Sequence, residues 1–140
     1  MNIIFDFNRT IYDPDTSTLV PGVLDVLTTF IARGAVLHLV SRREPGREVL
    51  LDDLGITQFF RSTSFANEKE VAIRQIIEAS EGVVYVVGDH LHDEIRIGNR
   101  QGARTVWFKR GKFAGLVPEG SVDIPWRTIE RMEDLVEHIA

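Results

Sequence analysis

Short apolar segments, each followed by polar residues, constrain the possible folds of this chain most strongly. The clearest of them are residues 3–5, 35–40, 83–87 and 103–108. Apolar runs of this length without alternating polar residues are typical of strands that are buried on both faces of a parallel sheet. Helical patterns separate the runs, and parallel strands need such crossover connections. We therefore predict an α/β fold, a doubly wound parallel sheet with helices on both faces.

Apolar spacing and turn-forming residues give the approximate bounds of the elements. Glycines and prolines open or end stretches whose apolar residues recur at intervals of three and four, as in amphipathic helices. The predicted strands are residues 3–5, 35–40, 59–62, 83–87 and 103–108, with a short extended piece near residues 123–124. The predicted helices are residues 23–33, 47–54, 68–79, 95–101 and 132–139, and residues 11–22 are expected to form a loop or small hairpin.

The composition excludes several classes of protein. A length of 140 residues suits one domain, so we predict a single domain over residues 1–140. The absence of cysteine excludes disulfides, thiolate metal sites and a cysteine nucleophile. A net charge of −5 disfavours nucleic-acid binding, which needs a basic surface. No apolar run approaches a membrane span and no leader pattern is visible, so we expect a cytoplasmic protein.

Four polar residues are expected to meet at one edge of the predicted sheet. Asp6, Ser41 and Asp89 each come at the end of a buried strand, and Lys69 lies at the start of a helix that follows a strand. The carboxyl ends of parallel strands share one edge, and α/β proteins bind ligands there. Asp6 alone would more often cap a turn, but the convergence of four such groups favours a functional site.

This set of side chains suits phosphoryl transfer with a bound cation. Converging carboxylates repel one another unless a hard cation joins them, and proteins commonly hold Mg²⁺ with carboxylates plus a substrate phosphate. A carboxylate can attack phosphorus and form an aspartyl-phosphate. An ammonium group and a hydroxyl can stabilise the oxygens of the transferring phosphoryl group. The sequence therefore predicts a Mg²⁺ cofactor and a phosphorylated substrate.

The order of these residues resembles that of the haloacid dehalogenase-like (HAD) hydrolases. The four motifs of that family are matched, in order, by DFNRT (residues 6–10), Ser41, Lys69, and Gly88-Asp89 with a following acid. The matches extend over nearly the whole chain, and each lies on the element where the family has it. The resemblance implies a phosphatase-type member of the family with a HAD-like, Rossmann-type sheet.

The resemblance also implies roles for the matched residues. Asp6 would be the nucleophile and a Mg²⁺ ligand, and Asn8 would offer its backbone carbonyl to the same ion. Thr10 would steady the first loop. Ser41 would bind a phosphoryl oxygen, and Lys69 would balance the charge of the phosphoryl group.

The fourth motif contributes the remaining metal ligands. Asp89 would hold Mg²⁺ directly or through water, together with an acid a few residues later in the chain. The residues that follow match the apolar and small positions of the family's helix only if that acid is Glu94, so we prefer Glu94 to Asp93. Arg42 directly follows Ser41 and is a candidate for binding a substrate anion.

Asn8 and Arg9 depart from the family pattern. In phosphatases of the family, an aspartate at position 8 protonates the leaving oxygen and later deprotonates the attacking water, and asparagine has no proton to exchange. Three interpretations stay open: a slow phosphatase for substrates with good leaving groups, a hydrolase that recruits another acid, and a HAD-fold binding or interaction module. Arg9 places a charge where the family usually has a small residue.

The intervals between the motifs leave no room for the cap domain that covers the site in many relatives. One loop and one helix lie between Asp6 and Ser41, and one helix and a short strand lie between Ser41 and Lys69. A phospho-accepting receiver domain is a further alternative, but it usually carries a pair of acids after its first strand, where this chain has the lone Asp6. The identity of the substrate and the oligomeric state stay open.

Overall fold

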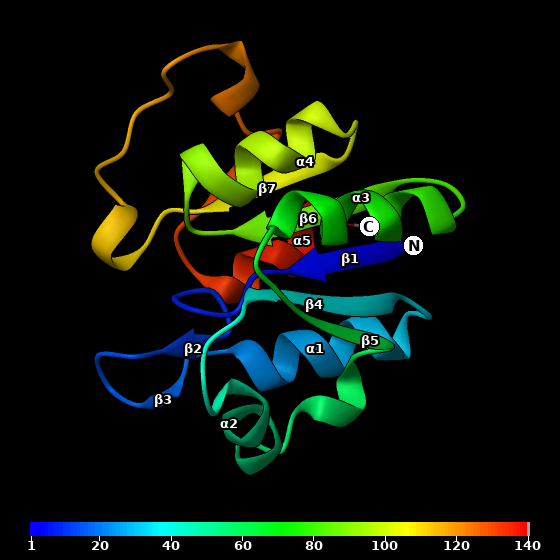
Figure 1. Ribbon diagram of the computed structural model, residues 1–140, viewed down its shortest axis with the longest axis vertical. Coiled ribbons are helices and arrows are strands. Elements are labelled where there is room, and N and C mark those ends of the chain that lie inside the picture. Colours follow the sequence, from blue (N-terminus) through cyan, green and yellow to red (C-terminus); the bar gives the residue numbers. More distant parts are fainter. Residues whose placement is uncertain (140) are drawn as a thin grey trace.

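The computed structural model describes residues 1–139, and in these residues it forms a six-stranded parallel sheet (Figure 1). The strands are, in spatial order, β5 (Ser62–Ala66), β4 (Val36–Arg42), β1 (Asn2–Phe5), β6 (Val84–Gly88), β7 (Arg104–Phe108) and β8 (Arg127–Ile129). All neighbouring pairs run parallel. The chain order reverses direction on either side of β1, which confirms the predicted doubly wound sheet.

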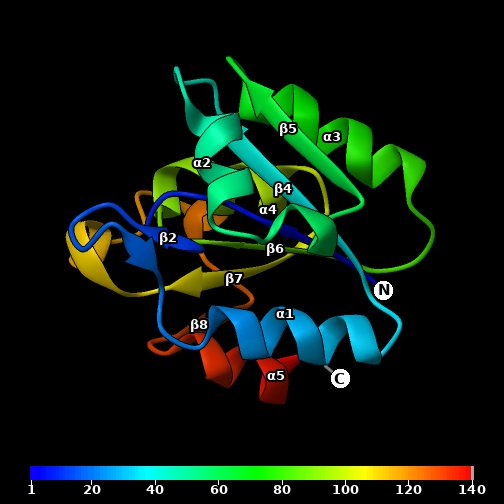
Figure 2. The same cartoon turned by 90° about the horizontal axis from the view of Figure 1, so that it is seen from below.

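Helices cover both faces of this sheet. They are α1 (Val23–Ala32), α2 (Arg47–Asp53), α3 (Lys69–Ala79), α4 (Arg96–Arg100) and α5 (Leu135–His138). Phe5 of β1 belongs to the core that contains Phe30 of α1 and Leu135 of α5, and Figure 2 shows these two helices side by side on one face. Ile4 belongs to the opposite core with Ile73 of α3 and Ile97 of α4. Within residues 1–139, none of the helices is both long and apolar enough to pass through a bilayer.

The register of the three central strands places their carboxyl ends side by side. Phe5, the last residue of β1, lies opposite Leu39 of β4 and Val87 of β6. Asp6 therefore follows β1 between two neighbouring strands that each continue for a short distance. Because β4 carries Ser41 beyond Leu39 and Asp89 follows β6, these three polar residues meet at one edge, as predicted from their positions in the sequence.

A small antiparallel hairpin follows the central strand. It consists of β2 (Tyr12–Asp13) and β3 (Thr18–Leu19), so the segment predicted as a loop or small hairpin is a hairpin. The Tyr12 ring stacks on Phe7 with the ring centroids 5.4 Å apart. This stacking fixes the hairpin against the loop that carries Asn8 and Arg9.

The strand predicted at residues 59–62 is wrong in its bounds. Thr57–Phe59 forms a 3₁₀ turn, and β5 begins only at Ser62. The Thr57 hydroxyl donates to Asp52 at 2.6 Å, which ties the start of the turn to the end of α2. The apolar pattern of this segment does not reveal such a local bond.

The extended piece predicted near residues 123–124 is also misplaced. Ser121–Asp123 forms a 3₁₀ turn, and the edge strand β8 begins at Arg127. Arg96 of α4 donates to the Asp123 carboxylate at 2.6 and 2.9 Å and holds the turn against that helix. The turn therefore depends on a contact between segments that are distant in the sequence.

The helix predicted at residues 95–101 corresponds to α4, but the turn that leads into it from β6 was not predicted. A π-helical turn over Leu91–Ile95 precedes α4. Such turns carry an extra residue and often occur at functional sites. Here the turn brings Glu94 close to the end of β6: a side chain on Gly88 would collide with the Glu94 carboxyl group. The glycine before Asp89 thus makes room for Glu94.

Candidate active site

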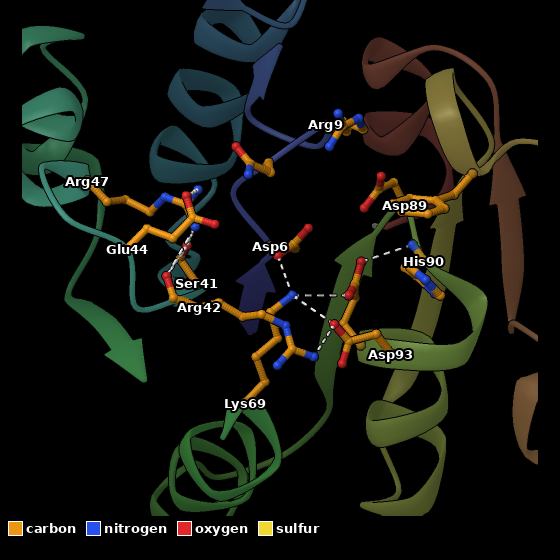
Figure 3. Close-up of a pocket in the computed structure, with 13 residues that line it drawn as sticks. Asp6, Arg9, Ser41, Arg42, Glu44, Arg47, Lys69, Asp89, His90 and Asp93 are labelled. Atoms are coloured by element: carbon orange, nitrogen blue, oxygen red, sulfur yellow. Dashed lines mark hydrogen bonds and ion pairs between the residues drawn. The ribbon is translucent and has the colours of Figure 1, made fainter. Parts of the chain in front are cut away.

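A cavity of about 180 Å³ opens at the edge where β1, β4 and β6 end (Figure 3). Its walls come from the loops after these strands and from the starts of α2 and α3. The lining residues are Asp6, Asn8, Arg9, Ser41, Arg42, Glu44, Arg47, Lys69, Asp89, His90, Asp93, Glu94 and Phe113. The cavity therefore contains every predicted site residue except Thr10.

Asp6 lies at the centre of this cavity and is only 6% exposed. Its backbone N–H donates to the Val87 carbonyl at 3.0 Å, so the main chain continues the sheet spacing one residue beyond β1. Thr10 is fully buried behind it and donates its hydroxyl to Asp6 Oδ2 at 3.5 Å. Thr10 thus supports the first loop from outside the cavity wall, where the resemblance places it.

Lys69 joins the acids of the site. Its ammonium group donates to Asp6 Oδ1 at 2.7 Å, to Glu94 Oε2 at 3.2 Å and to Asp93 Oδ2 at 3.3 Å. Burial alone would lower the pKa of Lys69, but the surrounding carboxylates outweigh burial and raise this pKa well above its ordinary value. Lys69 is therefore charged throughout the ordinary pH range and holds three acids from two segments together.

Three buried carboxylates form a group that suits a cation. Asp6, Asp89 and Glu94 each offer an oxygen, and these oxygens lie within 4.8 Å of one another. Burial and the charges of the neighbouring acids raise the pKa values of Asp89 and Glu94. Within residues 1–139, Asp89 Oδ2 is buried and has no hydrogen-bond partner. An all-oxygen donor set with an unpaired carboxylate oxygen fits a hard divalent cation such as Mg²⁺.

The two neighbouring acids of the π-helical turn have different positions. Glu94 is 2% exposed, and its Oε1 accepts a hydrogen bond from the His90 backbone N–H at 3.0 Å. Asp93 lies further out and accepts from Arg42 at 3.0 Å. Glu94, and not Asp93, thus belongs to the group of three carboxylates, which is the arrangement that the sequence register predicts.

Ser41 and Arg47 form a second polar group in the cavity. Arg47 donates to the Ser41 hydroxyl at 2.9 Å and to the Arg42 carbonyl at 3.1 Å, and it pairs with Glu44 at 2.7 Å. Its guanidinium also lies 5.4 Å from the centroid of the Phe7 ring. The sequence interpretation missed Arg47. Its only signal was its position at the first turn of the helix that follows Ser41.

Other polar and aromatic residues near the site lie at the rim of the cavity or outside it. His90 lines the cavity, whereas His92 pairs with Glu119 at 3.0 Å and is turned towards a later loop. Arg43 donates to the Phe65 carbonyl at 3.3 Å and does not line the cavity. Phe113, in the loop after β7, lines the cavity without having been predicted. A lone aromatic residue between glycines gives no sequence signal for such a role.

One curated protein and several solved structures are similar to this chain. No family model matches the sequence. The chain is 34% identical over 94 residues to a glyceraldehyde 3-phosphate phosphatase of Methanopyrus kandleri, a match that covers 60% of this chain and 40% of that protein. The chain thus spans less than half the length of this curated relative.

Solved structures resemble the chain over nearly its whole length. One is a HAD-superfamily hydrolase of Geobacter sulfurreducens, with a TM-score of 0.74 and 10% identity, covering 99% of this chain and 98% of that chain. Another is a D,D-heptose 1,7-bisphosphate phosphatase of B. bronchiseptica complexed with magnesium and phosphate. It has a TM-score of 0.71 and 16% identity and covers 98% of each chain. These similarities confirm the predicted HAD-like fold.

Proposed function

Because the chain has the fold of the HAD-like hydrolases, we propose that it is a Mg²⁺-dependent phosphohydrolase that acts through an aspartyl-phosphate intermediate. The observation that carries the proposal is the group of three buried carboxylates, Asp6, Asp89 and Glu94, in a cavity at the carboxyl edge of the sheet. Lys69 pairs with two of them, Asp6 and Glu94. Burying such a set is costly unless a cation offsets the repulsion between the carboxylates, and clusters of this kind in a cavity are typical of functional sites. The relative named as a phosphatase and the neighbour with bound phosphate support the same reaction class.

The proposed ligands of Mg²⁺ are Asp6, the backbone carbonyl of Asn8, Asp89 and, through water, Glu94. The unpaired Asp89 oxygen and the all-oxygen donor set fit this ion. The bound ion would offset the charge of the carboxylates and of the phosphoryl oxygens. The binding calorimetry described below tests this assignment independently of catalysis.

The side chains of the cavity have distinct parts in the proposed reaction. Asp6 attacks the phosphorus atom, its bond to phosphorus forms, and the bond from phosphorus to the leaving oxygen breaks. Lys69 and the Ser41 hydroxyl stabilise the phosphoryl oxygens, and Arg42 at the rim is a further contact for a substrate anion. Water then attacks the aspartyl-phosphate, releasing phosphate and restoring Asp6. Asn8 supplies no proton to the leaving oxygen, so substrates with good leaving groups are favoured.

The proposal is tested by assaying hydrolysis of a set of phosphate esters and acyl phosphates with and without Mg²⁺. We expect Mg²⁺-dependent release of phosphate by the wild-type protein and none by an Asp6→Asn variant that binds phosphate normally. The matched variant Asp93→Asn, which changes an acid at the rim of the same cavity, should keep most of the activity. Equal activity of the wild-type and Asp6→Asn proteins would show that Asp6 is not the nucleophile.

Calorimetry should separate Glu94 from Asp93 in Mg²⁺ binding. We expect Glu94→Gln to weaken Mg²⁺ binding by about tenfold or more, the usual effect of removing a group that orients metal ligands. Asp93→Asn should have a smaller effect, because Asp93 pairs with Arg42 outside the group of three carboxylates. The reverse order would contradict the assignment, and no binding to the wild type would exclude the metal site.

A binding or interaction module on the same fold is the second candidate, and Asn8 is the observation that favours it. If the wild-type protein binds Mg²⁺ and phosphate but hydrolyses none of the tested compounds, the site serves recognition and not turnover. The acidic chain, with a net charge of −5, favours a partner other than nucleic acid in either case.

A further inference from the structure

The cavity contains four cationic side chains, and Arg9 differs from the other three. Arg42 pairs with Asp93 at 3.0 Å, Arg47 with Glu44 at 2.7 Å, and Lys69 with Asp6 at 2.7 Å. Within residues 1–139, the Arg9 guanidinium makes no ion pair with a carboxylate, and its buried Nε has no hydrogen-bond partner. Arg9 is thus the cation of the cavity that has no carboxylate partner within the described residues 1–139.

The backbone holds Arg9 in a conformation that L-residues rarely adopt. Its φ is 62°, in the left-handed region, and it is one of two non-glycine residues with positive φ among residues 1–139. A hydrogen bond of 2.6 Å from the Arg9 N–H to the Tyr12 carbonyl helps to hold this conformation. Strain of this kind persists at functional sites where the side chain must point in one direction.

An aromatic ring, that of Phe113, lies beside the Arg9 side chain and is itself packed against His90. The guanidinium carbon of Arg9 lies 5.9 Å from the centroid of the Phe113 ring, and that ring packs on His90 with the centroids 4.3 Å apart. All three residues line the cavity. In the view of Figure 3, Asp6 lies between Lys69 and Arg9. Arg9 is thus drawn on the opposite side of Asp6 from Lys69, the residue proposed to stabilise the phosphoryl oxygens.

We propose that Arg9 binds a second anionic group, a carboxylate or a phosphate, on the leaving-group side of the substrate. This inference rests on the proposed function, because it assumes a phosphoryl group at Asp6. A guanidinium binds carboxylate and phosphate oxygens through paired N–H donors, and Phe113 keeps it facing the cavity. The substrate class is therefore a small phosphate ester or acyl phosphate whose leaving group carries its own negative charge.

Binding of substrate-like phosphonates, which cannot be hydrolysed, tests this inference without turnover. Isothermal titration in the presence of Mg²⁺ would compare simple alkylphosphonates with carboxyalkylphosphonates and alkylenebisphosphonates of increasing chain length. At the best length, we expect the second anion to increase affinity by about tenfold or more in the wild type, as for a hydrogen bond to a charged group. The two series show whether carboxylate or phosphate is the preferred second anion.

Arg9→Gln should remove this gain and leave the affinity for simple alkylphosphonates nearly unchanged, and Arg9→Lys should restore part of it. Lys112→Gln is the matched control, because Lys112 contacts the same Phe113 ring, at 5.3 Å, but does not line the cavity. It should keep the full gain. If the second anion increases affinity equally in the wild-type and Arg9→Gln proteins, Arg9 does not bind that anion, and the proposed function is unaffected. If no phosphonate binds to the wild type, the proposed function fails, and this inference fails with it.

Discussion

Replacing Asn8 with aspartate is expected to raise the rate of alkyl phosphate hydrolysis by up to about 10²–10⁴-fold, the usual contribution of a positioned general acid and base. An alkoxide leaves slowly unless it is protonated, and Asn8 has no proton to give. The half-buried Asn8 already lines the cavity, so the substitution changes chemistry more than shape. The measurement is the rate constant for an alkyl phosphate and for an aryl or acyl phosphate in both proteins.

The gain should be much smaller for the aryl or acyl phosphate, because these groups leave without protonation. His90 also lines the cavity, but burial lowers its pKa, so it is mostly neutral at neutral pH and a poor proton donor. A double variant with Asp6→Asn should stay inactive and serves as the control. Equal gains on both substrate types would contradict a leaving-group role, and no gain on either would favour the binding module.

Replacing Lys69 with methionine is expected to destabilise the Mg²⁺-free protein by about 3–5 kcal/mol, the usual cost of removing one partner from a buried ion pair. Lys69 is 7% exposed and contacts three acids. Without Lys69, Asp6 and Glu94 would have no ion-pair partner within residues 1–139, whereas Asp93 would keep its pairing with Arg42. Urea denaturation gives the free energy of unfolding. Lys109→Met is the control, because the exposed Lys109 side chain lies 5.7 Å from the Trp107 ring centroid and makes no ion pair within residues 1–139, so its loss should change stability little.

Both Mg²⁺ and acid should restore part of the stability of the Lys69→Met variant. Mg²⁺ binds the folded state and shifts the equilibrium towards it. The pKa values of Asp89 and Glu94 are raised in the folded protein, so the folded state keeps protons that the unfolded chain loses above about pH 4. The stability that these two groups contribute is therefore lost as the pH rises. The Lys69→Met variant should need more urea to unfold at about pH 5 than at neutral pH. A variant as stable as the wild type at neutral pH would refute the role of Lys69.

The central part of the fold could be predicted from the sequence because its strands are buried on both faces. β1 and β6 are almost entirely buried, so their apolar runs are continuous and their bounds are clear. The edge strands give no such pattern: β5 is half-buried throughout, and β8 has a single buried residue. Misplacement of these two strands follows directly from their position at the edges of the sheet.

The residues of the candidate site also divide into those that could be predicted from the sequence and those that could not. Asp6, Ser41 and Asp89 could be placed together because parallel topology alone brings strand ends to one edge. Arg47 and Phe113 could not, because their directions depend on a helix start and on a loop whose path is set by distant contacts. Arg9 was visible in the sequence as a departure from the family pattern. Its lack of a carboxylate partner within residues 1–139 became visible only when the partners of the other three cations were known.

The central position of β1 has a consequence for how the protein reaches its native state. β1 pairs with β4 and with β6, so Asn2 lies beside both Val36 and Val84. During synthesis, one edge of β1 has no partner until β6 has left the ribosome, and contacts between such distant residues form slowly. Asp89 directly follows β6 in the chain. Completion of the centre of the sheet and assembly of the acidic site are therefore one event, and partly synthesised chains that lack β6 have neither.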